Sequence, residues 1–363
     1  MRFISIVIAL VILVAAAAAG YWWYCMEKPY GAIPPDGVFV EIPHGESTRG
    51  VGHLLQKNGI LRSSTAFEIY ARRHQKRTLQ AGEYFFDHPL TGKEVFEKLA
   101  NGDVYQQPFT VKEAETIFEI AHDLQVAKYM SAEEFLKAAK DPASIQDIAP
   151  GAKTLEGFLF PATYNLPRHA SAAELTAMMT RKFREAVQQI SPSALVLDPG
   201  KPNESLLRKV TLASLVERET PKPDERPLVA GVFTNRLNKG MLLQCDPTVI
   251  YSLEELGKYH GTLSLKDLHY DSPYNTYLHA GLPPGPIGNP GEASLRAAFQ
   301  PAETDYLYFV ANTHGGHFFA ATLSEHVKNV AKYHRLLNGQ GDEPSTEEAN
   351  RLPAGSSAHK GRL

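Results

Sequence analysis

The chain has 363 residues, of which 43% are hydrophobic and 21% charged, and its formal net charge at pH 7 is -3. This length and composition predict one or two ordinary globular domains, without the basic excess typical of nucleic-acid-binding proteins. With only two cysteines, Cys25 and Cys245, the chain has no disulfide framework, and we expect Cys245 to be a buried small residue and not a nucleophile.

The N-terminal segment predicts a membrane span. An almost unbroken apolar run extends from Ile4 to Gly20, and four aromatic residues follow at 21–24. About 20 helical residues, each rising 1.5 Å, cross a hydrocarbon core of about 30 Å. The aromatic residues match an interfacial belt, and Arg2 with the amino terminus favours a cytoplasmic N-terminus. We therefore expect a single-pass anchor over 1–25 in the cell (inner) membrane, with the rest of the chain extracytoplasmic.

A cleaved signal peptide is the alternative for this segment. Ala15–Ala19 supplies small residues of the A-x-A kind that precede cleavage sites. The apolar stretch is long for a signal peptide, and an aromatic belt has little purpose if it is removed. These two features favour a retained anchor.

The next part of the chain predicts a linker and a small β/α unit. Proline and glycine residues over 26–36 are typical of an extended linker. From Gly37 to Pro108 the hydrophobic pattern alternates between strand and helix periods. It predicts strands over 38–42 and 81–86 and helices over 51–59, 60–80 and 91–101.

A run of basic residues lies within the helix expected over 60–80. It consists of Arg72, Arg73, Lys76 and Arg77. Such a run is most often a solvated helix face, but after a membrane span it can also lie near anionic headgroups.

The remainder predicts a larger mixed domain over 109–336 and a disordered tail over 337–363. Residues 109–149 suggest a strand near 109–111 and helices over 115–128 and 131–139, and turn residues and aromatics become dense after residue 151. The tail is polar and rich in Gly and Ser. The expected fold class is therefore α+β.

A candidate catalytic carboxyl group lies in residues 211–221, TLASLVERETP. At about 100° per residue, Glu219 shares a helix face with Leu212, Leu215 and Val216, and Glu217 points to nearly the opposite side. A carboxyl group among apolar side chains in the last helical turn should have a raised pKa and can donate a proton near neutral pH. The alternatives are that Glu219 is an ordinary surface residue and that Glu217 is the catalytic residue.

Four other segments combine Tyr, Asn, Gln and Pro without a regular helix or strand period. They are Leu155–Leu166, Ala230–Tyr251, Tyr274–Gly291 and Tyr306–Phe319. Such residues suit carbohydrate, because sugar faces stack on aromatic rings and hydroxyl groups need fixed hydrogen-bond partners. Each segment alone is better explained by turn formers and core aromatics.

Taken together, these segments resemble the MltG/YceG family of membrane-anchored endolytic murein transglycosylases over roughly Gly37 to Tyr333. The resemblance lies in LASLVERET, VFTNRL-x-x-GM-x-LQ-x-DPTVIY, the YNTY block with GLPPGPI, and YLYFVA with GGH-x-F. In this family the second Glu of E-x-E-T is taken as catalytic, which implies Glu219. The family's N-terminal unit resembles a LysM peptidoglycan-binding module, which implies one over 37–108. One departure is Ala114, where the family pattern has Gly, so the local turn is in question.

The resemblance implies cleavage of the β-1,4 bond between N-acetylmuramic acid and N-acetylglucosamine. The muramoyl 6-hydroxyl attacks its own anomeric carbon, so no water is consumed and one carboxyl group can serve first as acid and then as base. We expect this cleft to be lined by Gln244, Asp246, Tyr274 and Asn275, which would hold acetamido and hydroxyl groups. The implied partners are glycan strands, the membrane and peptidoglycan synthases, with no cofactor and no nucleic acid.

Three other functions stay open at this point. Glu156 could pair with Glu219, as the two carboxylates of a peptidoglycan hydrolase do. A non-catalytic wall-binding scaffold would use only the LysM-like unit. His314 and His317, separated by two glycines, could serve a metal-dependent peptidase, although the sequence has no H-E-x-x-H or C-x-x-C spacing.

Overall fold

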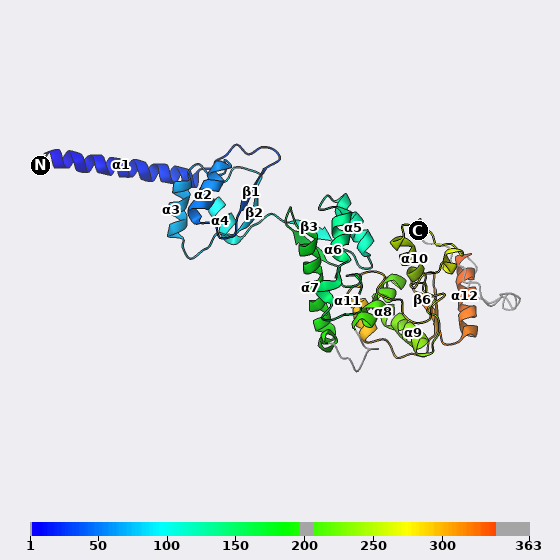
Figure 1. The fold of residues 1–363 in the computed structure, drawn as a ribbon. Helices are drawn as coiled ribbons and strands as arrows, with labels where there is room; N and C mark the ends of the chain where they lie inside the picture. Colours follow the sequence, from blue (N-terminus) through cyan, green and yellow to red (C-terminus); the bar gives the residue numbers. More distant parts are fainter. Residues whose placement is uncertain (1, 197–205, 339–363) are drawn as a thin grey trace. The chain divides into compact units, whose positions relative to one another are not determined.

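The computed structural model describes residues 2–196 and 206–338 (Figure 1). The chain forms two compact units. The first comprises Met1–Pro108 together with Asn165–His169, and the second comprises Phe109–Tyr164 and Ala170–Leu363. Helices and short paired strands occur in the described residues, so the predicted mixed α+β class is confirmed. The five residues 165–169 were not expected to join the first unit, because their contacts are distant in sequence.

The first unit begins with α1 (Arg2–Glu27), whose apolar side chains are exposed through most of its length. Residues Phe3–Glu27 are long and apolar enough to cross a membrane, and a signal sequence near the N-terminus would share these properties. Its last turn differs from the rest, since Cys25 and Met26 are 3% and 1% exposed.

The rest of the first unit surrounds a two-stranded antiparallel sheet. The elements are β1 (Val38–Ile42), α2 (Thr48–Lys57), α3 (Ser64–Arg73), β2 (Gly82–Phe86) and α4 (Gly92–Asn101). β1 pairs with β2 so that Val38 lies opposite Phe86. Because side chains alternate along a strand, Val40 and Tyr84 point into the core, and Phe39 and Phe85 point to the other face.

The prediction of an extended linker over 26–36 is wrong at its N-terminal end. α1 continues to Glu27, and Met26 packs into the core of the first unit. Tyr30 forms an isolated antiparallel bridge with Leu90, and its backbone N–H donates to the Leu90 carbonyl at 3.0 Å. Composition predicted an extended backbone, but it does not report the tertiary contacts that fix this segment.

The second unit is mainly helical. Its helices are α5 (Ile117–Val126), α6 (Ala132–Ala139), α7 (Ala172–Ile190), α8 (Leu206–Glu219), α9 (Arg226–Asn238), α10 (Asp246–Glu255), α11 (Glu292–Phe299) and α12 (Leu323–Leu337). Short 3₁₀ helices lie at Pro142–Ile145, Pro192–Leu195, Pro223–Glu225 and Asp267–His269. α12 extends to the start of the predicted tail, and residues 339–363 lie outside the described residues.

Two further strand pairs complete the described structure. β3 (Gln107–Thr110) pairs with β4 (Thr163–Leu166), and β5 (Tyr308–Ala311) pairs with β6 (His317–Ala320) as an antiparallel hairpin. The hairpin packs against α12, while α8 packs against α9, α10 and α11 (Figure 1).

α8 is the central helix of the second unit. Every residue from Val210 to Glu217 is buried, including the polar Thr211 and Ser214. The Ser214 hydroxyl accepts a hydrogen bond from the backbone N–H of Ile287 at 3.0 Å, which holds the GLPPGPI loop against the helix. α8 therefore has no solvent-facing side over these residues, in contrast to the single buried face that a helical wheel assumes.

Candidate active site

Glu219 is the last residue of α8. The Thr220 backbone N–H still bonds to the Val216 carbonyl at 3.3 Å, but Pro221 and Pro223 follow, and proline cannot continue a helix. Glu219 is half-buried, whereas Thr220 is fully buried. The helix therefore ends where its final carboxyl group reaches the surface of the unit.

The carboxyl group of Glu219 faces the start of α10. Its Oε2 accepts a weak hydrogen bond from the Cys245 thiol, with a sulfur–oxygen distance of 3.6 Å. Burial, followed by the nearby Glu219 carboxylate, raises the pKa of Cys245 well above its usual value. Cys245 is thus a neutral buried thiol, as predicted, and it serves as a partner for Glu219.

Gln244, next to this thiol, has a strained backbone. Its φ is +51°, in the left-handed region that costs a residue with a side chain about 1 kcal/mol or more. Two hydrogen bonds to Thr276 fix this segment. The backbone N–H of Gln244 donates to the Thr276 carbonyl at 3.1 Å, and that of Cys245 donates to the Thr276 hydroxyl at 3.0 Å. The Gln244 side chain is exposed. Strain of this kind is typical of functional sites.

Asp246 and Tyr277 form a second polar pair at the same place. The Tyr277 hydroxyl donates to Asp246 Oδ1 at 2.5 Å, and both residues are half-buried. Burial and then the bond to Asp246 raise the pKa of Tyr277, and Glu219 contributes in the same direction, so Tyr277 stays a neutral hydrogen-bond donor. We predicted Asp246 but missed Tyr277, although it is the second Tyr of the YNTY block.

Asn275 does not line a cleft, contrary to our prediction. Its side chain is 0% exposed. Nδ2 donates to the carbonyls of Leu268 and Tyr270 at 3.0 and 2.8 Å, and Oδ1 accepts from the backbone N–H of Tyr277 at 2.9 Å. Its amide is fully used in shaping the loop that carries Tyr277.

Tyr274 lies half-buried beside Tyr251, with ring centroids 5.0 Å apart. Burial raises its pKa to about 12, so its hydroxyl is neutral at physiological pH. It therefore offers both a ring and a neutral hydroxyl.

Arg236, also missed, joins three segments behind this site. Its guanidinium donates to the carbonyls of Leu307, Leu242 and Leu243 at 2.6, 3.2 and 2.9 Å. Burial lowers the pKa of Arg236, and nearby Tyr308, Tyr277 and Glu219 raise it. The sequence signal that could have identified Arg236 was its position in the VFTNRL motif. Its positive charge is close enough to Glu219 for the two groups to interact electrostatically.

Glu217 points away from Glu219, as the helical geometry predicts, but it is the more buried of the two. It is 7% exposed and accepts from Arg226 Nη2 at 2.6 Å and from Gly291 N at 2.9 Å. Arg226 also donates to Glu113 at 3.1 Å. Burial raises the pKa of Glu217, whereas the Gly291 N–H and Arg226 lower it. This carboxyl group is held in a buried ion pair.

Cavities open in the described part of the second unit. One of about 550 Å³ lies on the Glu217 side and is lined by Lys112, Glu113, Ala114, Glu115, Glu119, Glu217, Arg218, Pro221 and Arg226. Another, of about 510 Å³, is lined by Gly231, Thr234, Asn235 and residues 301–305. Neither includes Glu219.

Ala114, at the wall of the first cavity, keeps the turn in which we expected Gly. Its φ is +72°, and its backbone N–H donates to the Asn289 carbonyl at 3.0 Å. A Cβ on Gly288 would lie 2.5 Å from the Ala114 carbonyl oxygen, so the two backbones are in close contact. The departure from the family pattern therefore leaves the turn in place and costs roughly 1 kcal/mol of backbone strain.

Glu156 is buried in the second unit, with 2% of its surface exposed. Oε2 accepts from the backbone N–H of Ile117 and Oε1 from Asn289 Nδ2, both at 3.1 Å. Burial raises its pKa to about 8. Both carboxyl oxygens are engaged within the core, so we infer that Glu156 supports the first turn of α5 and the loop at Asn289.

Glu156 gives the fold a specific pH dependence. Its pKa rises from 4.5 to about 8 on folding, so the folded state binds more protons in this interval. Its stabilising contribution is complete below pH 4.5 and is lost as the pH rises to about 8, at up to about 1.4 kcal/mol per pH unit. Denaturant unfolding of Glu156→Gln between pH 5 and 8 should show a flatter profile than the wild type. An unchanged slope, matching that of the exposed control Glu292→Gln, would contradict the assignment.

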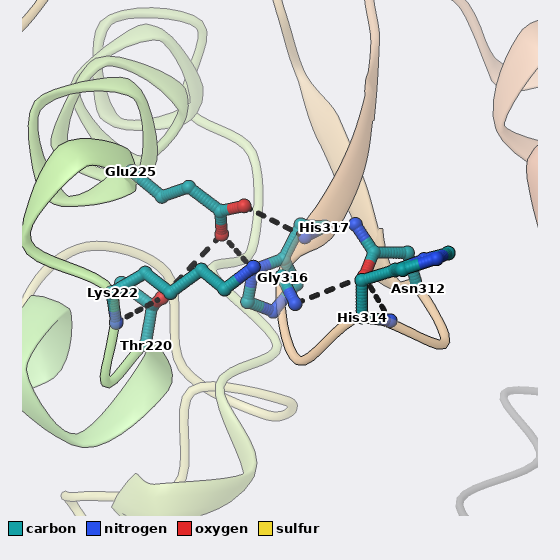
Figure 2. Close-up of polar contacts among 7 residues, drawn as sticks. All are labelled: Thr220, Lys222, Glu225, Asn312, His314, Gly316 and His317. Atoms are coloured by element: carbon teal, nitrogen blue, oxygen red, sulfur yellow. Dashed lines mark hydrogen bonds and ion pairs between the residues drawn. The ribbon is translucent and has the colours of Figure 1, made fainter.

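The β5–β6 hairpin forms hydrogen bonds to the segment that follows Glu219. Figure 2 shows Glu225 between Thr220 and His317. His317 Nδ1 lies 2.8 Å from Glu225 Oε2, its backbone N–H donates to Oε1 at 3.1 Å, and the Thr220 hydroxyl donates to Oε2 at 3.5 Å. A Cβ on Gly316 would lie 2.1 Å from Glu225 Oε1, so a side chain at this position would displace the Glu225 carboxylate.

The two histidines of this hairpin have different surroundings. His317 bonds to Glu225, whereas His314 is exposed and its backbone N–H donates to Asn312 at 2.8 Å (Figure 2). Within residues 2–196 and 206–338, no three His, Cys, Asp or Glu side chains are grouped so that they could hold a metal ion.

The Glu225–His317 contact predicts a kinetic effect. Glu225→Gln removes the charged acceptor and loosens the segment after Glu219. For the glycan cleavage that the sequence resemblance implies, we therefore expect kcat to fall about tenfold with little change in KM. Steady-state kinetics on soluble glycan strands would measure both constants. The control is Glu292→Gln, which breaks an exposed ion pair with Arg296 and should leave kcat unchanged. Equal kcat values for the two variants would exclude a positioning role.

Comparison with known proteins places these features in a family. Residues 40–332 match the model of the YceG-like family. The endolytic murein transglycosylase of Bacillus subtilis (strain 168) is 34% identical over 313 residues, covering 82% of this chain and 84% of that protein. The endolytic murein transglycosylase of Streptococcus pneumoniae serotype 2 (strain D39 / NCTC 7466) is 31% identical over 332 residues and 82% of this chain, which spans 58% of that protein's length.

A solved structure agrees with this similarity. The crystal structure of a yceG-like protein from Listeria monocytogenes matches with a TM-score of 0.54 at 30% identity, over 81% of this chain and 99% of that one. Since the family model matches well over half of the chain, this protein belongs to the YceG-like family.

Proposed function

We propose that this protein is an endolytic murein transglycosylase. It cleaves the bond between N-acetylmuramic acid and N-acetylglucosamine within nascent peptidoglycan strands, leaves 1,6-anhydromuramoyl ends and so terminates their elongation. The observation that carries the proposal is the half-buried Glu219 at the end of α8, facing the polar start of α10. The relatives named as endolytic murein transglycosylases support it.

In the proposed mechanism Glu219 first donates a proton and then accepts another. The protonated carboxyl group donates to the oxygen that leaves with N-acetylglucosamine as the bond from that oxygen to the muramoyl anomeric carbon breaks. The carboxylate then takes the proton of the muramoyl 6-hydroxyl, whose oxygen bonds to the same carbon. The proton count balances without water, so a second carboxyl group is not required, unlike in the two-carboxylate glycosidases.

The neighbouring polar groups are proposed to bind the sugars. Gln244 is exposed beside the reacting carboxyl group and can bond to an acetamido group. Asp246 and Tyr277 are bonded to each other, and their remaining oxygen lone pairs can accept from sugar hydroxyls. Tyr274 offers a ring on which a sugar face can stack. Because these groups are held by loop contacts before substrate arrives, they can support the oxocarbenium-like state without large rearrangement.

The first unit is proposed to be a LysM-like peptidoglycan-binding module on a single-pass, N-in anchor. An aromatic cluster supports glycan binding, because the Phe39 ring lies 4.6 Å from Phe85 and 4.9 Å from Tyr105 on the face of β1–β2 opposite the core. Anchoring raises the effective concentration of the enzyme where new strands emerge. We also propose that the protein contacts peptidoglycan synthases where new strands emerge.

A strand-length assay tests the proposed function. The full chain in detergent is incubated with long, uncross-linked glycan strands, and the product lengths are followed over time. Internal cleavage predicts strands of intermediate length early in the reaction, and a chelator should not change the rate. Release of disaccharides alone would contradict endolytic cleavage, and binding without cleavage would favour a wall-binding scaffold.

A further inference from the structure

The end of the apolar helix α1 is built into the first unit. The Trp22 indole N–H donates to the Ala66 carbonyl of α3 at 3.1 Å, and α1 contacts both α3 and α4. A Cβ on Gly92 would lie 2.8 Å from the Met26 sulfur, so α4 also approaches α1 closely. No free linker therefore separates the end of α1 from α3 and α4.

This attachment sets the depth of α3 in a bilayer. If α1 crosses the membrane, the residues from Phe3 to Trp22 account for about 30 Å at 1.5 Å per residue. Trp22 then lies at the boundary between hydrocarbon and headgroups, where Trp and Tyr are preferred. α3, bonded to Trp22, lies at the level of the headgroups.

Cationic side chains surround the aromatic residues at this boundary. The Arg73 guanidinium lies 5.3 Å from the Trp22 ring centroid, and Lys28 Nζ lies 5.5 Å from Trp23. The Arg62 guanidinium stacks between Tyr24 and Tyr30, at 4.3 and 4.5 Å. Stacking uses the face of a guanidinium, whereas phosphate binds at its N–H edge, so the two contacts are compatible.

The exposed side of α3 combines an apolar residue with positive charge. Ile69 is 41% exposed, and Arg73 follows one helical turn later. Arg72 is paired with Glu68 at 2.7 Å. Among the described residues, however, Arg62, Arg73 and Lys28 are in no carboxylate ion pair. An exposed aliphatic side chain flanked by unneutralised cations is typical of helices that lie in a membrane interface.

We propose that this α1–α3 corner, formed by Lys28, Arg62, Ile69 and Arg73, binds anionic phospholipid headgroups. The inference rests on the proposed membrane anchoring by α1. Each cation near an anionic surface adds to the attraction, and the effect weakens with salt. Headgroup binding would hold the first unit against the membrane in one orientation, which a single span alone does not do.

The chain carries its own probe for this surface, because Trp22 and Trp23 are its two tryptophans. The full chain is reconstituted in phosphatidylcholine vesicles containing some phosphatidylglycerol. A spin label is placed on the acyl chain of either lipid, at equal mole fraction. We expect labelled phosphatidylglycerol to quench the fluorescence about threefold more effectively than labelled phosphatidylcholine at low salt, and this preference should fall at high salt.

Variants test which side chains produce the preference. Arg73→Gln should lower the preference, and the Arg62→Gln/Arg73→Gln pair should bring the two lipids close to equal quenching. Arg296→Gln removes the same charge from an exposed ion pair on α11 and should keep the preference. Arg73 is exposed, so its replacement alone remains informative if the double variant does not fold.

The outcomes separate this inference from the anchoring on which it rests. Strong but equal quenching by both lipids in the wild type would overturn headgroup selectivity and support the span. Absence of quenching by either lipid would overturn the span itself. A preference that survives Arg73→Gln and the double replacement would assign the selectivity to other residues and contradict the proposed surface.

Discussion

Replacing Glu219 by Gln is expected to lower the rate of glycan cleavage by about 10²–10⁴-fold, the range typical for loss of a general acid–base group. Stability should change by less than about 0.5 kcal/mol, because Glu219 is half-buried and glutamine keeps an oxygen that can accept from the Cys245 thiol. Single-turnover cleavage of labelled strands measures the rate, denaturant unfolding measures the stability, and strand binding is measured in parallel.

Intact strand binding together with lost cleavage is the pattern that assigns chemistry to Glu219. Cleavage at the wild-type rate by Glu219→Gln would remove Glu219 from the mechanism. A combined loss of binding and fold would leave it only a structural role.

The second large effect is expected in stability, from Glu217→Ala. This change leaves Arg226, which is 4% exposed, with Glu113 as its one remaining acidic partner in the described part of the chain. It also leaves the Gly291 N–H without its acceptor. Removing one partner of a buried ion pair costs about 3–5 kcal/mol. Denaturant unfolding must be followed by far-UV circular dichroism, because both tryptophans lie in the first unit.

A matched double variant separates the ion pair from catalysis. Glu217→Leu combined with Arg226→Met replaces both charges by apolar groups and should recover most of the lost stability. If Glu217→Gln instead stays fully stable and loses cleavage, Glu217 is the catalytic residue. The cavity of about 550 Å³ beside it would then become the substrate site.

The sequence predicted the directions of the α8 side chains correctly, but it did not predict how deeply each of them is buried. The opposite directions of Glu217 and Glu219 follow from helical periodicity, which depends only on nearby backbone. Burial depends on the helices α9, α10 and α11 that pack around α8, and their positions are not visible in a single segment. The helical wheel therefore chose a carboxyl group on a face that is only half-buried, while Glu217 lies deeper.

The loop residues show the same limit. Residue type suggested that Asn275 binds sugar and that Glu156 is a second acid. In the structure both side chains form hydrogen bonds within the fold, which the sequence does not reveal. Asn289, which donates to Glu156, lies 133 positions away, and Asp246 lies 31 positions from Tyr277. The prediction of a linker was wrong at its N-terminal end for the same reason. Pro and Gly content indicates a backbone preference, but it does not indicate that Met26 packs into a core.

The most direct test of the proposed function is mass spectrometry of the new strand ends made by the full chain in water containing heavy oxygen. Cleavage by the muramoyl 6-hydroxyl predicts anhydromuramoyl ends that are lighter than reducing ends by one water and carry no heavy oxygen. Reducing muramoyl ends that have incorporated the label would contradict the account, because hydrolysis would then be the reaction.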